Sequence, residues 1–283
     1  MASIKHANSI LVATDMSPRA DRAVQRAFRI ARQKGLAVKV LTVIDDAMPD
    51  DLVETVQDKA FSKVDRFAST VADGVPYEVI AEAGDPTQCI LTAAQNNPES
   101  LLVLGVHRSR PFLDALRETT MQRVVRQTEN PVLLVKEAAD HDYDHVLAAC
   151  DFSPASTAAM EFGGMLSGDG IVTPVHVVHM PYRDMLESRP GVGTNLEASF
   201  VKEAQAAETE WRNCSDLSER IAPKTEMPVG APYAVFKQLA QQGDADLITV
   251  GAHSDVGAPR TVLGSLSIDL MREPPCDVLI ARP

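Results

Sequence analysis

This chain contains the same sequence unit twice. Residues 82–136 align without a gap on residues 228–282. The shared motifs are Gly84-x-Pro86 and Gly230-x-Pro232, Gly105-x-His107 and Gly251-x-His253, Val132-Leu133 and Val278-Leu279, and Asp15-x-Ser17-Pro18 and Asp151-x-Ser153-Pro154. A duplication of this length predicts two copies of one folding unit. Where the copies differ, a function can have been kept in one and lost in the other.

The length and composition favour a soluble protein with two cores. A chain of 283 residues can form two domains of ordinary size, each with its own buried interior. Apolar residues make up 45% of the chain, but no run approaches the roughly 18 apolar residues that a membrane span needs. Residues 1–9 lack the apolar core of a secretory signal. We therefore expect a cytoplasmic protein.

Charge and cysteine spacing exclude several classes of function. The net charge of −12 argues against nucleic acid as a main partner, because phosphate backbones need clustered Lys and Arg. The four cysteines form no C-x-x-C pair, so neither a zinc site nor a disulfide framework is predicted. We expect reduced, mostly buried thiols, with Cys150, next to Asp151, as the one candidate for reactivity. The cysteines are Cys89, Cys150, Cys214 and Cys276.

The seven histidines do not predict a metal site. His176 and His179 lie three residues apart in or at the end of a predicted strand, which puts them on opposite faces. His107 and His253 occupy matching positions, one in each copy. Neither arrangement gathers three ligands, so we expect no bound metal from histidine.

Each copy predicts five strands that alternate with helices. Short unbroken apolar runs are typical of parallel strands covered on both faces, and Ser17-Pro18 and Ser153-Pro154 are good helix starts. The predicted strands are 9–14, 38–44, 77–81, 101–104 and 132–135 in the first copy, and 146–150, 175–178, 224–227, 247–250 and 278–281 in the second. The fold class is therefore α/β, with two doubly wound, five-stranded parallel sheets. The acidic stretch 137–144 is the natural linker and divides the chain into domains 1–138 and 143–283.

One end of the second copy has the residues for an anion site. In doubly wound sheets, ligands bind beyond the carboxyl ends of the strands, where the strand order reverses. Asp151 and Gly251 each follow a strand at this edge, and Gly264-Ser265 opens the last helix. Free amide protons at a helix amino terminus favour an anion, so this turn predicts a phosphate cradle. The Ser265 hydroxyl could add a donor or ligate Mg²⁺.

At these positions the chain resembles the universal stress proteins, over nearly all of both halves. In that family, nucleotide-binding members carry Gly-x-x-Gly, nine residues and then Gly-Ser or Gly-Thr, and this loop holds the phosphates of ATP. An Asp after the first strand and a Val after the second hold adenosine. The resemblance implies a Rossmann-like fold of the adenine nucleotide α-hydrolase-like type, and ATP, ADP or AMP, with or without Mg²⁺, in the second copy. The site that it implies is Asp151, Ser153, Val177, Gly251, His253, Ser254, Gly264, Ser265 and Leu266.

The match to the family motif is incomplete in both copies. In the second copy Ser254 stands where the family pattern prefers Gly. In the first copy Arg108 replaces that Gly, and Glu118-Thr119 replaces Gly-Ser. A carboxylate at the position of the γ-phosphate repels a triphosphate, so we expect the first site to be degenerate.

A purely structural interpretation of the same residues stays open. Gly251 and Gly264 can shape a tight strand-to-helix connection in a fold that binds no nucleotide. Asp151 can stabilise the helix beside it through the helix dipole. The chain then is an interaction protein of the same family, or a carrier of another small ligand, such as an apolar or anionic metabolite.

The sequence contains no credible catalytic set. Neither Ser17 nor Ser153 lies in a G-x-S-x-G elbow, and no G-x-x-x-x-G-K-[ST] loop supplies a lysine for phosphoryl transfer. We therefore expect a binding protein that acts through an unknown protein partner, not an enzyme. Slow ATP hydrolysis, which the family resemblance implies for some members, is left open.

The resemblance also implies how the two copies join. Family members pair through their last strands, antiparallel across a two-fold axis. Residues 132–135 and 278–281 would form this pair within one chain, giving an internal pseudo-dimer that needs no second chain to cover its edges. A further homodimer is compatible with the sequence.

Overall fold

The computed structural model describes residues 7–44, 49–106, 119–179, 192–243, 245–253 and 263–283. Within these ranges nine strands form one sheet, in the order β3-β2-β1-β4-β5-β9-β8-β6-β7. The strands are β1 (Ser9–Thr14), β2 (Ala37–Ile44), β3 (Tyr77–Ala83), β4 (Ser100–Gly105), β5 (Val132–Val135), β6 (His145–Ala149), β7 (Ile171–Val175), β8 (Leu247–Gly251) and β9 (Asp277–Ala281). All neighbours are parallel except β5 and β9, which confirms two doubly wound α/β halves.

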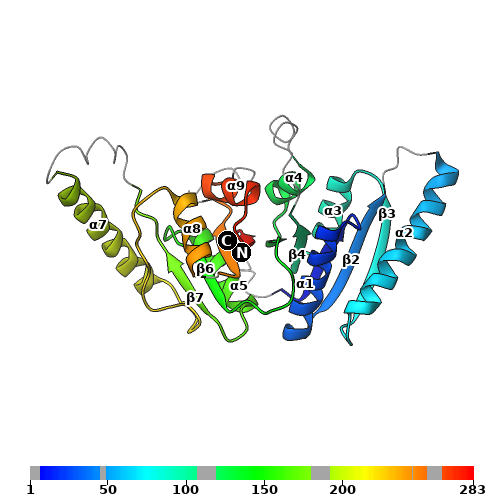
Figure 1. The fold of residues 1–283 in the computed structure, drawn as a ribbon, viewed down its shortest axis with the longest axis horizontal. Helices are drawn as coiled ribbons and strands as arrows, with labels where there is room; N and C mark the ends of the chain where they lie inside the picture. Colours follow the sequence, from blue (N-terminus) through cyan, green and yellow to red (C-terminus); the bar gives the residue numbers. More distant parts are fainter. Residues whose placement is uncertain (1–6, 45–48, 107–118, 180–191, 244, 254–262) are drawn as a thin grey trace.

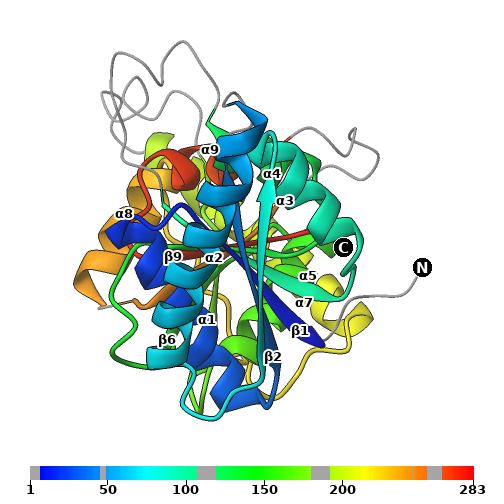
Figure 2. The ribbon, with the colours of Figure 1, turned by 90° about the vertical axis from the view of Figure 1, so that its right-hand side faces the viewer.

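Helices cover both faces of the sheet (Figure 1). They are α1 (Pro18–Lys34), α2 (Asp50–Val71), α3 (Pro86–Gln95), α4 (Thr120–Gln127), α5 (Pro154–Leu166), α7 (Val192–Cys214), α8 (Pro232–Gln242) and α9 (Ser265–Arg272). One buried cluster joins the strands to α1, α2, α5 and α7, and a second joins them to α3, α4, α8 and α9. Figure 2 looks at the first half from its outer end, with α2 in front. Each half is thus a three-layer unit.

The helix starts follow the predicted capping chemistry. The side chains of Ser17 and Ser153 accept hydrogen bonds from the backbone of α1 and α5, and a proline occupies the first turn of each helix. The residue after α1 is Gly35, whose φ of 67° lies in the left-handed region that glycine adopts without steric strain. These local signals set the boundaries of α1 as the sequence predicts.

The predicted strand 224–227 of the second half is not a continuous strand. Segment 221–229, which we call the outer segment, meets β7 only through isolated bridges. Pro174 lies in β7, and the amides of its neighbours Val172 and His176 donate toward the outer segment. Proline has no amide proton, so a hydrogen bond is missing on this edge. The prediction of five strands is therefore wrong for the second half, whose described residues form four.

The two halves join through their last strands, as predicted. Strands β5 and β9 pair antiparallel, with Leu133 opposite Leu279. Both leucines are fully buried and belong to one cluster that contains residues from α1 and α5. In Figure 1, α4 and α9 lie above this centre and α1 and α5 below it. The internal pseudo-dimer is confirmed, and its halves share a core.

Two matching cations reach across the junction. Lys136 and Arg282 each follow the last strand of their half and occupy aligned positions in the repeat. Arg282 donates to the carbonyl oxygens of Val125 and Thr128 at the end of α4, at 3.2 and 2.9 Å. Lys136 Nζ donates to the Pro275 carbonyl oxygen after α9, at 2.7 Å. Cations at helix carboxyl ends interact favourably with the helix dipole, so each half stabilises the other.

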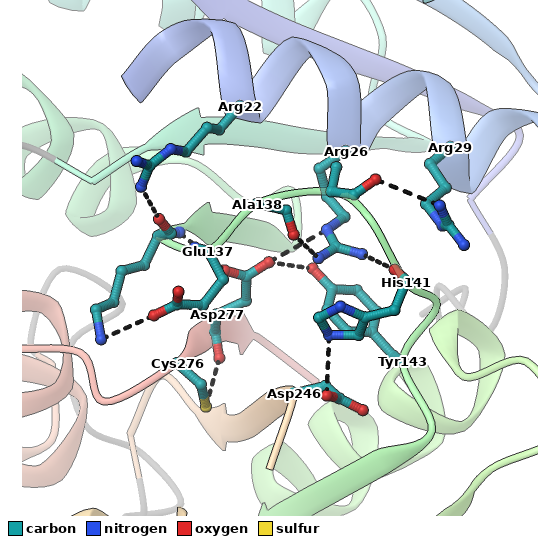
Figure 3. Close-up of polar contacts among 12 residues, drawn as sticks. Arg22, Arg26, Arg29, Glu137, Ala138, His141, Tyr143, Asp246, Cys276 and Asp277 are labelled. Atoms are coloured by element: carbon teal, nitrogen blue, oxygen red, sulfur yellow. Dashed lines mark hydrogen bonds and ion pairs between the residues drawn. The ribbon is translucent and has the colours of Figure 1, made fainter. Parts of the chain in front are cut away.

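A buried charge cluster fastens the linker between the halves (Figure 3). Asp277 in β9 and Arg26 in α1 are 0% and 1% exposed, and Arg26 Nε lies 3.4 Å from Asp277 Oδ2. This contact is an ion pair without hydrogen-bond alignment. Tyr143 donates its hydroxyl to Asp277 Oδ2 at 2.6 Å, and the backbone amides of Lys136 and Glu137 donate to Oδ1. One carboxylate therefore holds α1, β9 and the linker together.

The rest of the cluster consists of linker carbonyls around one guanidinium. Arg26 donates to the carbonyl oxygens of Ala138 and His141, and its guanidinium lies 4.4 Å from the centre of the Tyr143 ring. Burial raises the pKa of Asp277, while Arg26 opposes that change. Burial also raises the pKa of Tyr143 far above its ordinary value, so this phenol stays a donor.

The cysteines differ from the prediction in part. Cys150 and Cys276 are buried, but Cys214 is exposed. Burial, with a smaller contribution from Asp151, raises the pKa of Cys150 to about 12. This thiol therefore stays protonated at neutral pH, which argues against the reactivity considered for it. Among the described helices, none is long and apolar enough to cross a membrane.

Candidate functional site

The sheet topology brings the predicted site residues of the second half to one edge. Strand β6 lies between β7 and β8, so the strand order reverses at β6 and β8. Asp151 follows β6, Val177 follows β7, and Gly251 ends β8. Because these strands are parallel, their carboxyl ends meet at the same edge. This is the position at which doubly wound sheets bind ligands.

Asp151 has a structural task at this edge. Its Oδ1 accepts a hydrogen bond from the Ser153 amide at 3.0 Å, which closes the turn before α5. Phe152, inside the turn, has a φ of 65°, a strained backbone for this residue. Asp15, Met16 and Ser17 form the same turn in the first half, with a 3.0 Å bond and a φ of 60°. Since both halves share this turn, Asp151 by itself does not distinguish a binding half.

Gly251 is required by close packing against α5. A Cβ at this position would lie 2.9 Å from the Ala155 carbonyl carbon and the Ser156 nitrogen, both of them backbone atoms. In the first half a Cβ at Gly105 would lie 3.0 Å from the Arg19 carbonyl oxygen. The fold therefore explains this glycine in both halves without a ligand.

Gly264 is not required by the fold. Its φ is −64°, and a Cβ built on it would meet no atom closer than 3.8 Å. Its amide donates to the Ala252 carbonyl oxygen at 2.8 Å, and Ser267 Oγ donates to the Gly251 carbonyl oxygen at 2.9 Å. These two bonds hold the start of α9 against the end of β8.

Among the residues that the structure describes, no side chain caps the amide protons at the start of α9. Gly264 is the N-cap residue and has no side chain to accept from them. Ser265 is exposed in the first turn, and Leu266 packs against the apolar cluster that also includes Val177. An uncapped helix start with a bare backbone is suited to an anion.

The start of α4, in the first half, is capped by its own side chains. Thr119 Oγ1 accepts from the Gln122 amide at 3.2 Å, and Gln122 Oε1 accepts from the Thr119 amide at 3.0 Å. This capping box uses donors for which α9 has no N-cap side chain as acceptor. Sequence reasoning missed it, although the Thr-x-x-Gln spacing is visible. Arg108, Glu118 and Ser254, on which the predicted difference rested, lie outside the described residues.

His253 brings an unsatisfied nitrogen to the same region. It follows β8 by two residues, and its Nδ1 is buried without a hydrogen-bond partner in the described part of the chain. A Cβ on Gly264 would lie 3.9 Å from the His253 Cα, so the two residues are neighbours.

An aromatic cluster next to Asp151 was not predicted. Phe152 stacks on His176 with ring centres 4.6 Å apart, and Trp211 of α7 lies 5.7 Å from Phe152. His176 Nδ1 lies 2.8 Å from the Cys150 carbonyl oxygen. His176 is therefore engaged within the fold. In the described ranges no group of three His, Cys, Asp or Glu side chains could hold a metal ion.

The fold defines a class of proteins: tandem α/β proteins whose two doubly wound halves join into one continuous sheet. The model of the universal stress protein family matches residues 7–136 and again residues 142–282. The chain therefore belongs to the universal stress protein family.

Individual relatives agree with the family assignment. The chain is 31% identical over 141 residues to universal stress protein A homolog 1 of Coxiella burnetii, covering 48% of this chain and 94% of that protein. Its fold is similar to a universal stress protein of Archaeoglobus fulgidus, with a TM-score of 0.70, 21% identity and coverage of 98% and 97% of the two chains. A protein of Pseudomonas aeruginosa PAO1 has a TM-score of 0.62 at 18% identity, with coverage of 99% and 94%. These two structures support the fold.

Alanine substitution tests whether close packing requires glycine at positions 251 and 264. We expect Gly251→Ala to lower the free energy of unfolding by about 1–3 kcal/mol, because the methyl group meets backbone atoms of α5. Gly264→Ala has room and should change stability by less than about 0.5 kcal/mol. Urea unfolding of both variants measures this. Equal losses would show that the start of α9 also needs its glycine for packing.

Proposed function

We infer that this universal stress protein binds ATP or another adenine nucleotide in its second half. In this proposal the chain acts in the cytoplasm as part of a stress response, through contacts with a protein partner and without catalysis. The proposed division is a degenerate domain 1–138 and a nucleotide-binding domain 143–283. The observation that carries the proposal is the start of α9, which is bare and uncapped although the fold leaves room for a side chain there.

The proposed binding mode follows from local electrostatics. The chain is strongly acidic, so its overall charge does not attract a triphosphate. The amide protons of the first turn of α9 supply local positive potential, worth about 0.3–1 kcal/mol per anionic charge at an exposed helix end. Asp151 and Val177 would hold adenosine, and Ser265 would contact a phosphate or Mg²⁺. His253 and Leu266 would line the loop, and Ser153 would support Asp151.

Replacing Gly264 by aspartate tests the proposal. Aspartate is a good N-cap residue, so the Gly264→Asp variant should fold with unchanged or slightly higher stability. Its carboxylate would use the free amide protons and repel phosphate, so we expect ATP affinity to fall at least about tenfold, or 1.4 kcal/mol. Calorimetric titration with ATP and Mg²⁺ measures the affinity, and thermal unfolding measures the stability.

Two controls make that result specific. Gly264→Ala adds only a methyl group and should lose less affinity than Gly264→Asp. Wild-type protein purified from cells and then denatured should release close to one adenine nucleotide per chain. ATP binding by Gly264→Asp that equals the wild type would remove the case for the α9 site. No released nucleotide and no ATP binding by the wild type would reject nucleotide binding altogether.

Two observations favour a second candidate, an interaction protein of the family that binds no nucleotide. Asp151 and Gly251 belong to the family motif, yet each has a structural partner that is repeated in the first half. Binding of another small ligand, such as an apolar or anionic metabolite, is a further alternative. The release experiment separates these alternatives from the nucleotide proposal.

A further inference from the structure

The outer edge of the second half contains a cavity of about 570 Å³. In the first half β2 and β3 pair without interruption from Val38–Tyr77 to Ile44–Ala83. In the second half Val172 bridges Ile221, but Val175 bridges Glu226, so the outer segment gains two residues over this interval. These extra residues bulge away from β7. The cavity is lined by the bulge, β7 and α7.

One wall of the cavity is a preorganised carboxylate. Glu208 of α7 accepts through Oε1 from Arg212 Nε and from the Thr225 amide, both at 2.9 Å. Arg212 also donates to Thr225 Oγ1 at 3.2 Å, and Thr225 is 2% exposed. Burial would raise the pKa of Glu208, but hydrogen bonds from Thr225 and Arg212 outweigh it, and the pKa is lowered. The Glu208 carboxylate is therefore ionised and held in place on the wall of the cavity, with Arg212 as its counter-charge.

The rim of the cavity presents both signs of charge. Lys224 and Glu226 lie two residues apart on the bulge and are exposed. Neither forms an ion pair with another side chain in the ranges that the structure describes. Gln205 adds an amide, and Met227 adds an apolar surface. An ammonium group and carboxylates thus line one space without neutralising each other.

We propose that this cavity binds small zwitterions of the α-amino acid class. The ligand ammonium lies toward Glu208 and Glu226, its carboxylate lies toward Lys224, and its side chain lies toward Met227. A volume of about 570 Å³ falls in the usual range of 300–1,000 Å³ for small-molecule sites and accommodates an amino acid. A ligand with a single charge leaves one side of the cavity unsatisfied. The site is separate from α9 and does not depend on nucleotide binding.

Calorimetric titration of the full chain with glycine, L-leucine and L-glutamine tests the proposal. We expect saturable binding of at least one of them in the millimolar range or tighter. Acetate and methylamine, which carry one charge each, should bind at least about tenfold more weakly. No saturable binding of the three amino acids, or equal binding of methylamine, would overturn the proposal.

Charge-reversal variants test whether the amino acid binds in this cavity. Lys224→Glu and Glu226→Lys should each weaken binding about tenfold, while folding is unaffected because both residues are exposed. The double variant restores one charge of each sign on the rim but leaves Glu208 on the side of the new lysine, so it should regain only part of the affinity. Lys59→Glu, an equal change on the exposed face of α2, is the control and should bind like the wild type. Unchanged affinity in both single variants would show that the amino acid binds elsewhere.

Discussion

Replacing Asp277 by alanine is expected to lower the free energy of unfolding by about 3–5 kcal/mol. The substitution leaves the guanidinium of Arg26, which is 1% exposed, without a counter-charge. It also removes the acceptor of the Tyr143 hydroxyl and of two linker amides (Figure 3). Because these partners come from α1, the linker and β9, the loss should weaken the attachment of the halves. Urea unfolding of wild type and variant measures the difference.

The chain contains a matched control for this result. Arg29, one turn further along α1, pairs with Asp142 of the linker, but these side chains are 32% and 40% exposed. Ion pairs in contact with water contribute little, so Asp142→Ala should cost no more than about 1 kcal/mol. If the two aspartate substitutions cost the same, burial is not what makes the Asp277 cluster important.

Placing aspartate at both Leu133 and Leu279 is expected to separate the halves. These residues face each other in the antiparallel pair β5–β9 and are fully buried. Each carboxylate would lose its hydration, at an effective cost of several kcal/mol, and the two like charges would lie side by side. The desolvation of the two carboxylates and their mutual repulsion together reach the whole free energy of unfolding of a typical domain, about 5–15 kcal/mol. Small-angle scattering should show a larger radius of gyration.

An exposed leucine tests whether the effect belongs to the junction. Leu52 of α2 is 49% exposed, and Leu52→Asp should change stability by no more than about 0.5 kcal/mol. If the double variant keeps the scattering curve of the wild type, the halves stay docked without this contact. The shared core would then not be what joins them.

Much of the architecture could be predicted because its signals are local and repeated. Apolar runs, Ser-Pro helix starts and a long internal alignment are enough for a doubly wound unit present twice. The wrong prediction of strand 224–227 had a visible warning, Pro174 in β7, whose lack of an amide proton matters only on the edge that faces the outer segment. Which edge a strand residue faces depends on its neighbours, and the periodicity of one strand does not reveal it.

The candidate site was predicted in position but not in the role of each residue. Asp151 and Gly251 were placed correctly at the edge of the sheet, yet their closest contacts are structural and recur in the first half. The feature that separates the halves is the cap of one helix, Thr119 in α4 against Gly264 in α9. The sequence contains both residues. The steric freedom of Gly264 is a property of the atoms around it, and these come from the residues just after β8 and from α9.

By itself, the sequence determined the repeat and the fold class, because apolar periodicity and local helix-start signals act over short stretches of chain. The strands through which the halves join were implied by the resemblance to the universal stress proteins. Only the tertiary structure decided that Arg26 and Asp277 meet and that the bulge of the outer segment lines a cavity. It also decided that no atom packs closely against the position of a Cβ on Gly264. Each depends on distances between segments far apart in sequence, and burial makes those distances energetically decisive.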